Sequence, residues 1–210
     1  MIDANPAAIS ADPLSIRITG GLESRGLAVV DDFLGPAELR ALQDVAAVER
    51  PRMAPATVGR TRRLDPAIRS DRIAWLDLAG GPAPVLALAG RLLDLGRAIN
   101  AALLLGLWDL ELHFALYRPG DAYVPHRDRL AADDVRVLSC VIYLNNGWRR
   151  EDRGELRLYR GEASGAFEDV LPLGGRLVVF LSDLMLHEVR PATRERLSLA
   201  GWFKRRRSTP

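Results

Sequence analysis

The pattern of apolar and polar positions changes character once along this chain, near Trp108. Before that point the strongest pattern is helical, because apolar residues recur every three or four positions over residues 84–105. A second helix is predicted to begin at Gly35-Pro36. Short apolar runs at residues 26–30 and 73–78 predict strands. After Trp108, apolar and polar residues alternate over short lengths, which is typical of β-strands.

The part of the chain after Trp108 is predicted to be a series of seven strands. Turn signals such as Pro119-Gly120, Asn145-Asn146-Gly147 and Gly174-Gly175 separate them. Many short strands with few helices between them favour a β-sandwich or jelly roll. We therefore expect a mainly β fold braced by the N-terminal helices. The predicted strands are residues 111–117, 123–128, 135–144, 155–159, 176–181, 187–189 and 197–203.

Two segments carry no periodic pattern. Residues 1 to about 20 are rich in Ala, Pro and Asp and are predicted to be poorly ordered or weakly docked. Residues 50–72 hold seven arginines against two aspartates, which predicts a long, mobile, basic loop. Long loops of this kind in compact domains are often active-site lids.

Composition narrows the class of protein. At 210 residues, with 48% hydrophobic and 27% charged residues, the chain is expected to form one soluble domain. It has no run of eighteen apolar residues and no N-terminal pattern of a secretory signal, so no membrane partner is expected. The single cysteine, Cys140, fits a reducing cytoplasm. The net charge is only +2, and the basic tail Lys204-Arg205-Arg206-Arg207 is expected to be a solvated end rather than a nucleic-acid contact.

Candidate metal ligands stand in the strand-rich part. His126 and Asp128 are two residues apart, so on an extended strand both side chains point to the same side. His187 is a further available imidazole, and Arg196 follows nine residues later. Two imidazoles and one carboxylate form the facial triad that binds Fe(II) and leaves the opposite positions open.

From about residue 26 to 203 the chain resembles the prolyl-hydroxylase branch of the iron- and 2-oxoglutarate-dependent oxygenases. The similar segments follow the family's order: GLAVVDDFLG, RSDRIAWL, YRPGDAYVPHRD, CVIYLNNGW, GELRLYRG and HEVRPATRERLSLAGWF. The resemblance implies a double-stranded β-helix, a jelly roll of the cupin-like type. It also implies one oxygenase domain, with N-terminal strands, helices and basic loop over about 1–110, the β-helix core over about 111–203, and the basic tail at 204–210.

The resemblance also assigns site residues. His126, Asp128 and His187 would bind iron, while Arg196 and Tyr143 would bind the distal carboxylate of 2-oxoglutarate. The side chains expected to line the cosubstrate or substrate pocket are Tyr117, Tyr123, Leu156 and Trp202. The turn between Tyr117 and His126 is one residue shorter than in close relatives, a departure that bears on the direction of Tyr117. The third histidine, His113, is interpreted as a satisfied core histidine or a support for the metal site.

The activity that the resemblance implies is hydroxylation of a prolyl residue in a protein, coupled to decarboxylation of 2-oxoglutarate to succinate. Fe(II), 2-oxoglutarate, dioxygen and ascorbate are the expected reagents, and the 50–72 loop is the expected lid. A cytoplasmic, monomeric enzyme is expected, with a translation factor or ribosomal protein as its substrate.

Other functions fit parts of this pattern. A protein-kinase loop would need an Asn five residues after the Asp of HRD, where this chain has Asp133. A zinc hydrolase would leave Arg196 and Tyr143 without a role. An oxygenase of the same superfamily acting on nucleic acid or on a small molecule stays open, since the six-residue spacing of Arg190 and Arg196 occurs in nucleic-acid demethylases. A non-catalytic β-helix that only binds a partner is the remaining alternative.

Overall fold

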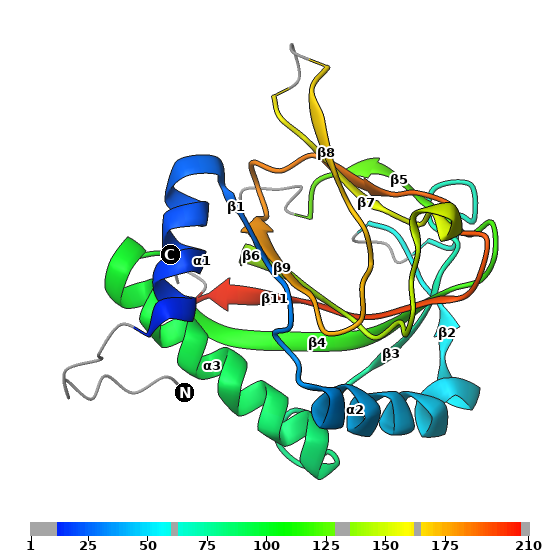
Figure 1. Cartoon of the computed structure of the whole chain (residues 1–210), viewed down its shortest axis with the longest axis horizontal. Coiled ribbons are helices and arrows are strands. Elements are labelled where there is room, and N and C mark those ends of the chain that lie inside the picture. Colours follow the sequence, from blue (N-terminus) through cyan, green and yellow to red (C-terminus); the bar gives the residue numbers. More distant parts are fainter. Residues whose placement is uncertain (1–11, 60–62, 129–134, 162–164, 207–210) are drawn as a thin grey trace.

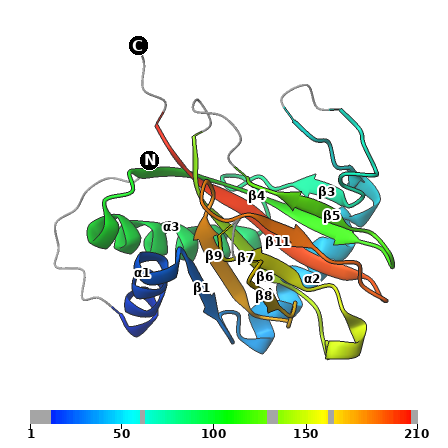
Figure 2. The same cartoon turned by 90° about the horizontal axis from the view of Figure 1, so that it is seen from above.

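Two antiparallel β-sheets face each other, and three α-helices pack against the outer face of the larger sheet (Figure 1). The computed structural model describes residues 12–59, 63–128, 135–161 and 165–206. In Figure 1 the helices α2 and α3 lie below the strands β4 and β11, and the smaller sheet lies above them. Figure 2 shows the same fold from above, with β11 beside β4. This is the predicted double-stranded β-helix, which is confirmed.

The larger sheet has the strand order β1-β9-β6-β11-β4-β3-β2. Its strands are β1 Leu27–Val30, β2 Ala54–Pro55, β3 Arg72–Trp75, β4 Leu107–Tyr117, β6 Arg136–Tyr143, β9 Leu177–Leu181 and β11 Arg196–Arg205. The smaller sheet has the order β5-β10-β7-β8. Its strands are β5 Tyr123–His126, β7 Leu156–Tyr159, β8 Phe167–Val170 and β10 His187–Val189.

Alternation along β11 separates the hydrophobic core from the site. Leu199 and Phe203 point to the helices and join the larger core cluster. Residues of opposite parity, among them Arg196, Ser198 and Trp202, point between the sheets and line a cavity. Phe203 packs closely on α3 (Ala83–Leu103), because a Cβ on Gly96 would lie 3.1 Å from its ring. Full burial of such a phenylalanine stabilises the fold by about 1.5–3 kcal/mol.

The N-terminal segment contains a helix that the sequence pattern did not predict. Helix α1 spans Pro13–Arg25, whereas residues 1 to about 20 were expected to be poorly ordered or weakly docked. Asp12 caps this helix, since its carboxylate accepts from the backbone N–H groups of Leu14 and Ser15, and proline stands at the first helical position. Ile18 and Leu22 are buried, which docks the helix. Residues 1–11 lie outside the described part.

The predicted elements elsewhere match with small shifts. Helix α2 spans Pro36–Glu49, and α3 begins and ends within two residues of the prediction. The seven predicted strands correspond to β4, β5, β6, β7, β9, β10 and β11. Strand β8 was missed, because Phe167–Val170 is only four residues long and has one buried side chain.

The segment 50–72 is more ordered than the predicted mobile loop. It contains the 3₁₀ helix η1 Arg50–Arg52, strand β2, and a β-bridge between Val58 and Arg63. Its end is anchored to the smaller sheet: Ser70 N–H donates to the Ala122 carbonyl at 3.1 Å, and the Ala122 N–H donates to Ser70 Oγ at 2.9 Å. The prediction failed because these partners lie 52 residues away in sequence. Residues 60–62 are not among those described.

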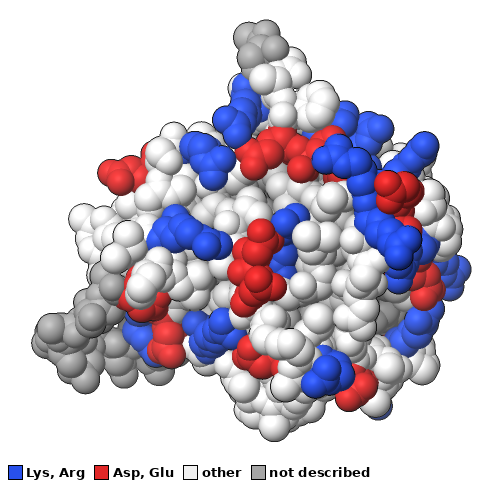
Figure 3. Space-filling view, viewed as in Figure 1, with Lys and Arg blue, Asp and Glu red and all other residues white. Residues whose placement is uncertain are grey.

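Charged groups on the surface are mostly interleaved. Lys204 belongs to β11 and pairs with Asp109 and Glu111, each at 3.0 Å. Arg206 stacks on Trp108. Basic and acidic side chains lie next to each other across the face seen in Figure 3. Within the described part of the chain, none of the helices has the length and apolar character needed to span a membrane.

Candidate metal centre and cosubstrate pocket

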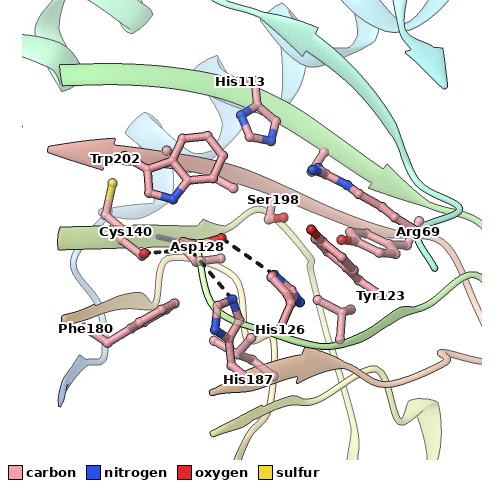
Figure 4. Close-up of a pocket in the computed structure, with 18 of the residues that line it drawn as sticks. Arg69, His113, Tyr123, His126, Asp128, Cys140, Phe180, His187, Ser198 and Trp202 are labelled. Carbon is pink, nitrogen blue, oxygen red and sulfur yellow. Dashed lines mark hydrogen bonds and ion pairs between the residues drawn. The ribbon is translucent and has the colours of Figure 1, made fainter. Parts of the chain in front are cut away.

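Strand pairing brings the two candidate histidine ligands together. β5 and β10 are antiparallel neighbours, and His126 lies directly opposite His187 in their register. Their ring centroids are 4.2 Å apart although 61 residues separate them in sequence. The sequence predicted that Asp128 would lie on the same strand as His126. β5 instead ends at His126, so Asp128 lies just beyond it. Its carboxylate nevertheless points to the same side as His126 (Figure 4).

The three side chains converge at a spacing that suits one metal ion. One ligand atom from each of His126, Asp128 and His187 lies within 4.8 Å of the other two. Nε2 of His126 is 3.6 Å from Oδ1 of Asp128, and Nε2 of His187 is 3.6 Å from Oδ2.

The tautomers of both histidines are set by the backbone. Nδ1–H of His126 donates to the Val124 carbonyl at 2.8 Å, and Nδ1–H of His187 donates to the Met185 carbonyl at 3.0 Å. Both Nε2 lone pairs are therefore left free to face the ion.

The charge states of Asp128 and His187 suit the binding of a cation. Burial works to raise the pKa of Asp128, but the neighbouring His187 and His126 and a hydrogen bond from Ser139 hold it well below its usual range. Burial lowers the pKa of His187 to about 4, against the opposing pull of Asp128. The carboxylate is thus ionised and the imidazole neutral near pH 7, which are the forms that bind metal. The residues fit a 2-His-1-carboxylate iron site.

Ser139 is a site residue that the sequence analysis missed. Its hydroxyl donates to Oδ2 of Asp128 at 2.6 Å and lies 2.9 Å from the hydroxyl of Ser182. Such partners orient metal-binding carboxylates. The alternation of side chains along β6 could have identified Ser139, because it places Ser139 on the same side of the strand as Tyr143.

A buried cationic pocket lies at one end of the cavity. Arg196 is only 2% exposed, and its guanidinium lies 5.1 Å from the Tyr117 ring centroid and 5.0 Å from that of Tyr143. Nε donates to the Gly154 carbonyl at 2.9 Å. Gly154 has φ +74°, and a Cβ there would lie 2.8 Å from Ala192, so a glycine is needed for this support. Within the described ranges, Arg196 has no carboxylate partner.

Tyr117 and Tyr143 lie beside Arg196, and Leu156 lines the same cavity. The buried hydroxyl of Tyr143 lies beside Arg196 without completing a hydrogen bond to it, and burial raises its pKa. Tyr117 and Leu156 also line the cavity, so the shorter turn does not turn Tyr117 away. A buried arginine and an unpaired hydroxyl suit the distal carboxylate of 2-oxoglutarate.

An ion pair from the basic segment closes the side of the cavity. Tyr123 stacks on His126, with ring centroids 3.4 Å apart, and Arg69 lies over Tyr123 at 4.9 Å (Figure 4). Arg69 forms a bidentate pair with the fully buried Asp71 at 2.6 and 2.9 Å. Neither residue was predicted from the sequence to be part of the site.

His113 is buried, but it is not the satisfied core histidine that was one of its two interpretations; its role as a support for the metal site stays a prediction. It is 1% exposed, and neither ring nitrogen has a hydrogen-bond partner in the described structure. Burial lowers the pKa of His113 to about 3, and the positive charges of Arg69 and Arg136 add to this effect.

A neutral buried His113 predicts pH-dependent stability. The unfolded chain takes up the proton near pH 6.5 and the folded chain only near pH 3, so stability falls as the pH drops below 6.5. Between pH 7 and pH 5 this one group should cost the wild type about 2 kcal/mol. His113→Met lacks this imidazole and does not lose that stability. Denaturant unfolding should therefore show that the free energy of unfolding of the variant, relative to wild type, is higher at pH 5 than at pH 7 by that amount. An equal difference at pH 7 and pH 5 would contradict a neutral, buried His113.

Comparison with known proteins agrees with this geometry. Residues 112–204 match the family model of the 2OG-Fe(II) oxygenase superfamily. A solved prolyl-4-hydroxylase from Pseudomonas putida superposes with a TM-score of 0.83 and is 41% identical, covering 92% of this chain and 99% of that one. A Trichoplax adhaerens prolyl hydroxylase, solved in complex with a peptide fragment of the hypoxia inducible factor oxygen degradation domain, has a TM-score of 0.83 at 25% identity, covering 91% and 89% of the two chains.

Human Egl nine homolog 1 is 30% identical over 200 residues. The match covers 87% of this chain but 44% of the human protein, so the chain spans about half the length of that curated relative. The two solved bacterial and animal enzymes are covered almost completely. The chain therefore belongs to the prolyl hydroxylase branch of the 2OG-Fe(II) oxygenase superfamily, whose reagents are Fe(II), 2-oxoglutarate and dioxygen.

Proposed function

We propose that this chain hydroxylates a prolyl residue in a protein substrate while converting 2-oxoglutarate to succinate. The observation that carries the proposal is a complete His126–Asp128–His187 triad beside the buried Arg196–Tyr143 pair, in a chain that covers 99% of a 41% identical prolyl-4-hydroxylase. A non-catalytic β-helix would have no need of ionised Asp128, of two histidines held as one tautomer, and of an unpaired buried arginine at once.

The metal ligands in this proposal are His126, Asp128 and His187. When bound, Fe(II) together with 2-oxoglutarate and dioxygen supplies the oxidation that turns a substrate C–H bond into C–OH. The protein holds the two Nε2 lone pairs in place through the Val124 and Met185 carbonyls. Ser139 fixes the rotation of the Asp128 carboxylate. These contacts preorganise the ligands before the ion arrives.

Arg196 and Tyr143 would bind the distal carboxylate of 2-oxoglutarate. The guanidinium offers a charged, directional donor in a buried site, and the Tyr143 hydroxyl adds a second donor that nothing else uses. Tyr117, Tyr123 and Leu156 would form the walls that fix its orientation and exclude water. A zinc hydrolase would leave this carboxylate pocket without a ligand.

The part of segment 50–72 that precedes the anchored Ser70 would act as the lid over the substrate. Arginines of this segment could select an acidic substrate, but Arg69 is already paired with Asp71, and Arg63 is paired with Asp65 at 2.7 Å. We further propose a monomeric enzyme in the reducing cytoplasm, with ascorbate as reductant. A translation factor or ribosomal protein would be its substrate. The buried, unpaired Cys140 is consistent with the reducing compartment.

The spacing of Arg190 and Arg196 does not support an oxygenase that acts on nucleic acid. Arg190 is 44% exposed and pairs with Glu188, whereas Arg196 is buried, so the two arginines do not form one pocket. Lys204 is likewise held by Asp109 and Glu111.

Incubation of the protein, Fe(II) and 2-oxoglutarate with lysate from a strain lacking the gene should add one oxygen to a defined proline. Tandem mass spectrometry would detect it as a peptide heavier by the mass of one oxygen atom. The same lysate treated with the His126→Ala variant is the control and should show no such peptide. Oxidised nucleobases or free small molecules as the only products would overturn the prolyl assignment.

A further inference from the structure

Three buried polar nitrogens in the cavity are not used by the reaction proposed above. They are Nδ1 and Nε2 of His113 and Nε1 of Trp202, all without a hydrogen-bond partner in the described structure. Both side chains line the same cavity as the metal triad. Buried polar groups are almost always hydrogen-bonded, because leaving one unpaired is costly. Three unpaired nitrogens facing one cavity therefore point to a ligand that is absent from the free protein.

The two side chains lie at the opposite end of the cavity from the 2-oxoglutarate pocket. His113 is the β4 partner of Ala200 on β11, and Trp202 follows two residues later. Arg196 is four residues before Ala200, which corresponds to roughly 13 Å along a strand. Trp202 pairs with Ser139, the residue that holds Asp128. Its indole nitrogen faces the triad in Figure 4. The unpaired nitrogens thus line the same cavity as the triad, at the end away from Arg196.

The surrounding residues make this end of the cavity a rigid aromatic wall. The rings of His113 and Trp202 are stacked, with centroids 5.5 Å apart. Trp75, which is 54% exposed, packs on His113 at 4.8 Å, and Arg136 lies over the Trp202 ring at 3.6 Å. Ala200 has a small side chain at the point where β11 passes His113, and it lines the cavity as well.

The donor and acceptor set matches an uncharged amide. A neutral imidazole offers one N–H donor and one lone pair, and an indole offers one donor only. A backbone peptide group offers a carbonyl acceptor and an N–H donor. Proline has no backbone N–H, so the nearest donor in a substrate belongs to the residue after the target proline. A carboxylate or phosphate would gain nothing from the imidazole lone pair.

We propose that His113 and Trp202 form a subsite that hydrogen-bonds the backbone peptide groups beside the substrate residue undergoing oxidation. This inference rests on the proposed prolyl hydroxylase function and adds the residues that set affinity for the peptide backbone. The subsite is filled only when substrate enters. Its loss raises the KM for the peptide without changing the KM for 2-oxoglutarate.

The test uses a nonapeptide library with proline fixed at the centre and measures succinate release as library concentration is varied. His113→Met removes both nitrogens at similar volume and should raise the library KM about tenfold, since a buried peptide group is left unpaired. His113→Gln retains a donor and an acceptor and should stay within about threefold of wild type. Trp202→Phe should raise the KM about fivefold. The matched control is Trp108→Phe, which removes an indole outside this cavity and should leave the library KM unaltered.

The possible outcomes separate the two proposals. If the library does not stimulate succinate release by the wild type, the proposed prolyl function fails, and this inference fails with it. If the wild type is stimulated but His113→Met and Trp202→Phe keep its KM, the nitrogens have a structural role or are satisfied by water, and only the subsite is wrong. His113→Met should melt no lower than wild type, because the imidazole has no hydrogen-bond partner in the described part of the chain. A lower melting temperature with unchanged KM would also favour the structural role.

Discussion

Replacement of both His126 and His187 with alanine should abolish iron binding and 2-oxoglutarate turnover. Each variant position removes one of three donors whose ligand atoms lie within 4.8 Å of one another. Loss of groups that merely orient metal ligands already costs roughly 10–100-fold in metal affinity or activity. Removal of two direct ligands should therefore exceed roughly 100-fold. The measurement is Fe(II) titration with succinate release assayed in parallel.

A graded variant separates ligand loss from misfolding. Ser139→Ala keeps all three ligands but removes the 2.6 Å hydrogen bond to Asp128, so its metal affinity should fall roughly 10–100-fold, less than that of the double variant. Thermal melting would check that each variant folds. Metal content and turnover equal to wild type in the double histidine variant would refute the triad.

Local sequence patterns were sufficient for the elements that carry most of the fold. The α3 pattern and the alternation after Trp108 identified the long helix and seven strands, because each depends on burial of one face of a single element. The Asp12-Pro13 pair that starts α1 is also a local signal. It was overlooked because the flanking composition resembled a disordered segment.

Two features of the structure depend on long-range contacts and could not be predicted from local sequence patterns. The order of residues 50–72 depends on Ser70 bonding to Ala122, and the approach of His187 to His126 depends on the pairing of β10 with β5. Local residue spacing contains neither fact. The approach of His187 to His126 could be predicted only from the family resemblance, because the resemblance implies the fold as well as the motif. The resemblance did not supply the unpaired state of His113, which depends on all side chains surrounding that residue.

Arg196→Ala is expected to raise the KM for 2-oxoglutarate roughly tenfold or more. A charged hydrogen bond to a carboxylate contributes about 1.5–3 kcal/mol, and each 1.4 kcal/mol corresponds to a factor of ten in affinity. The variant also loses the bond to the Gly154 carbonyl and leaves a cavity, so its melting temperature should fall. Tyr143→Phe avoids this ambiguity. Its hydroxyl has no hydrogen-bond partner among the described residues, so stability should hold while the KM for 2-oxoglutarate rises about fivefold.

Arg194→Ala is the matched control for Arg196→Ala. Arg194 lies two residues earlier, its side chain is 47% exposed, and it pairs with Asp152 outside the cavity. Its removal should leave the KM for 2-oxoglutarate within about twofold of wild type, because exposed pairs contribute only about 0–1 kcal/mol. A rise in KM of equal size in both variants would show a general effect of positive charge rather than a carboxylate pocket. An unaltered KM in both Arg196→Ala and Tyr143→Phe would place the distal carboxylate elsewhere.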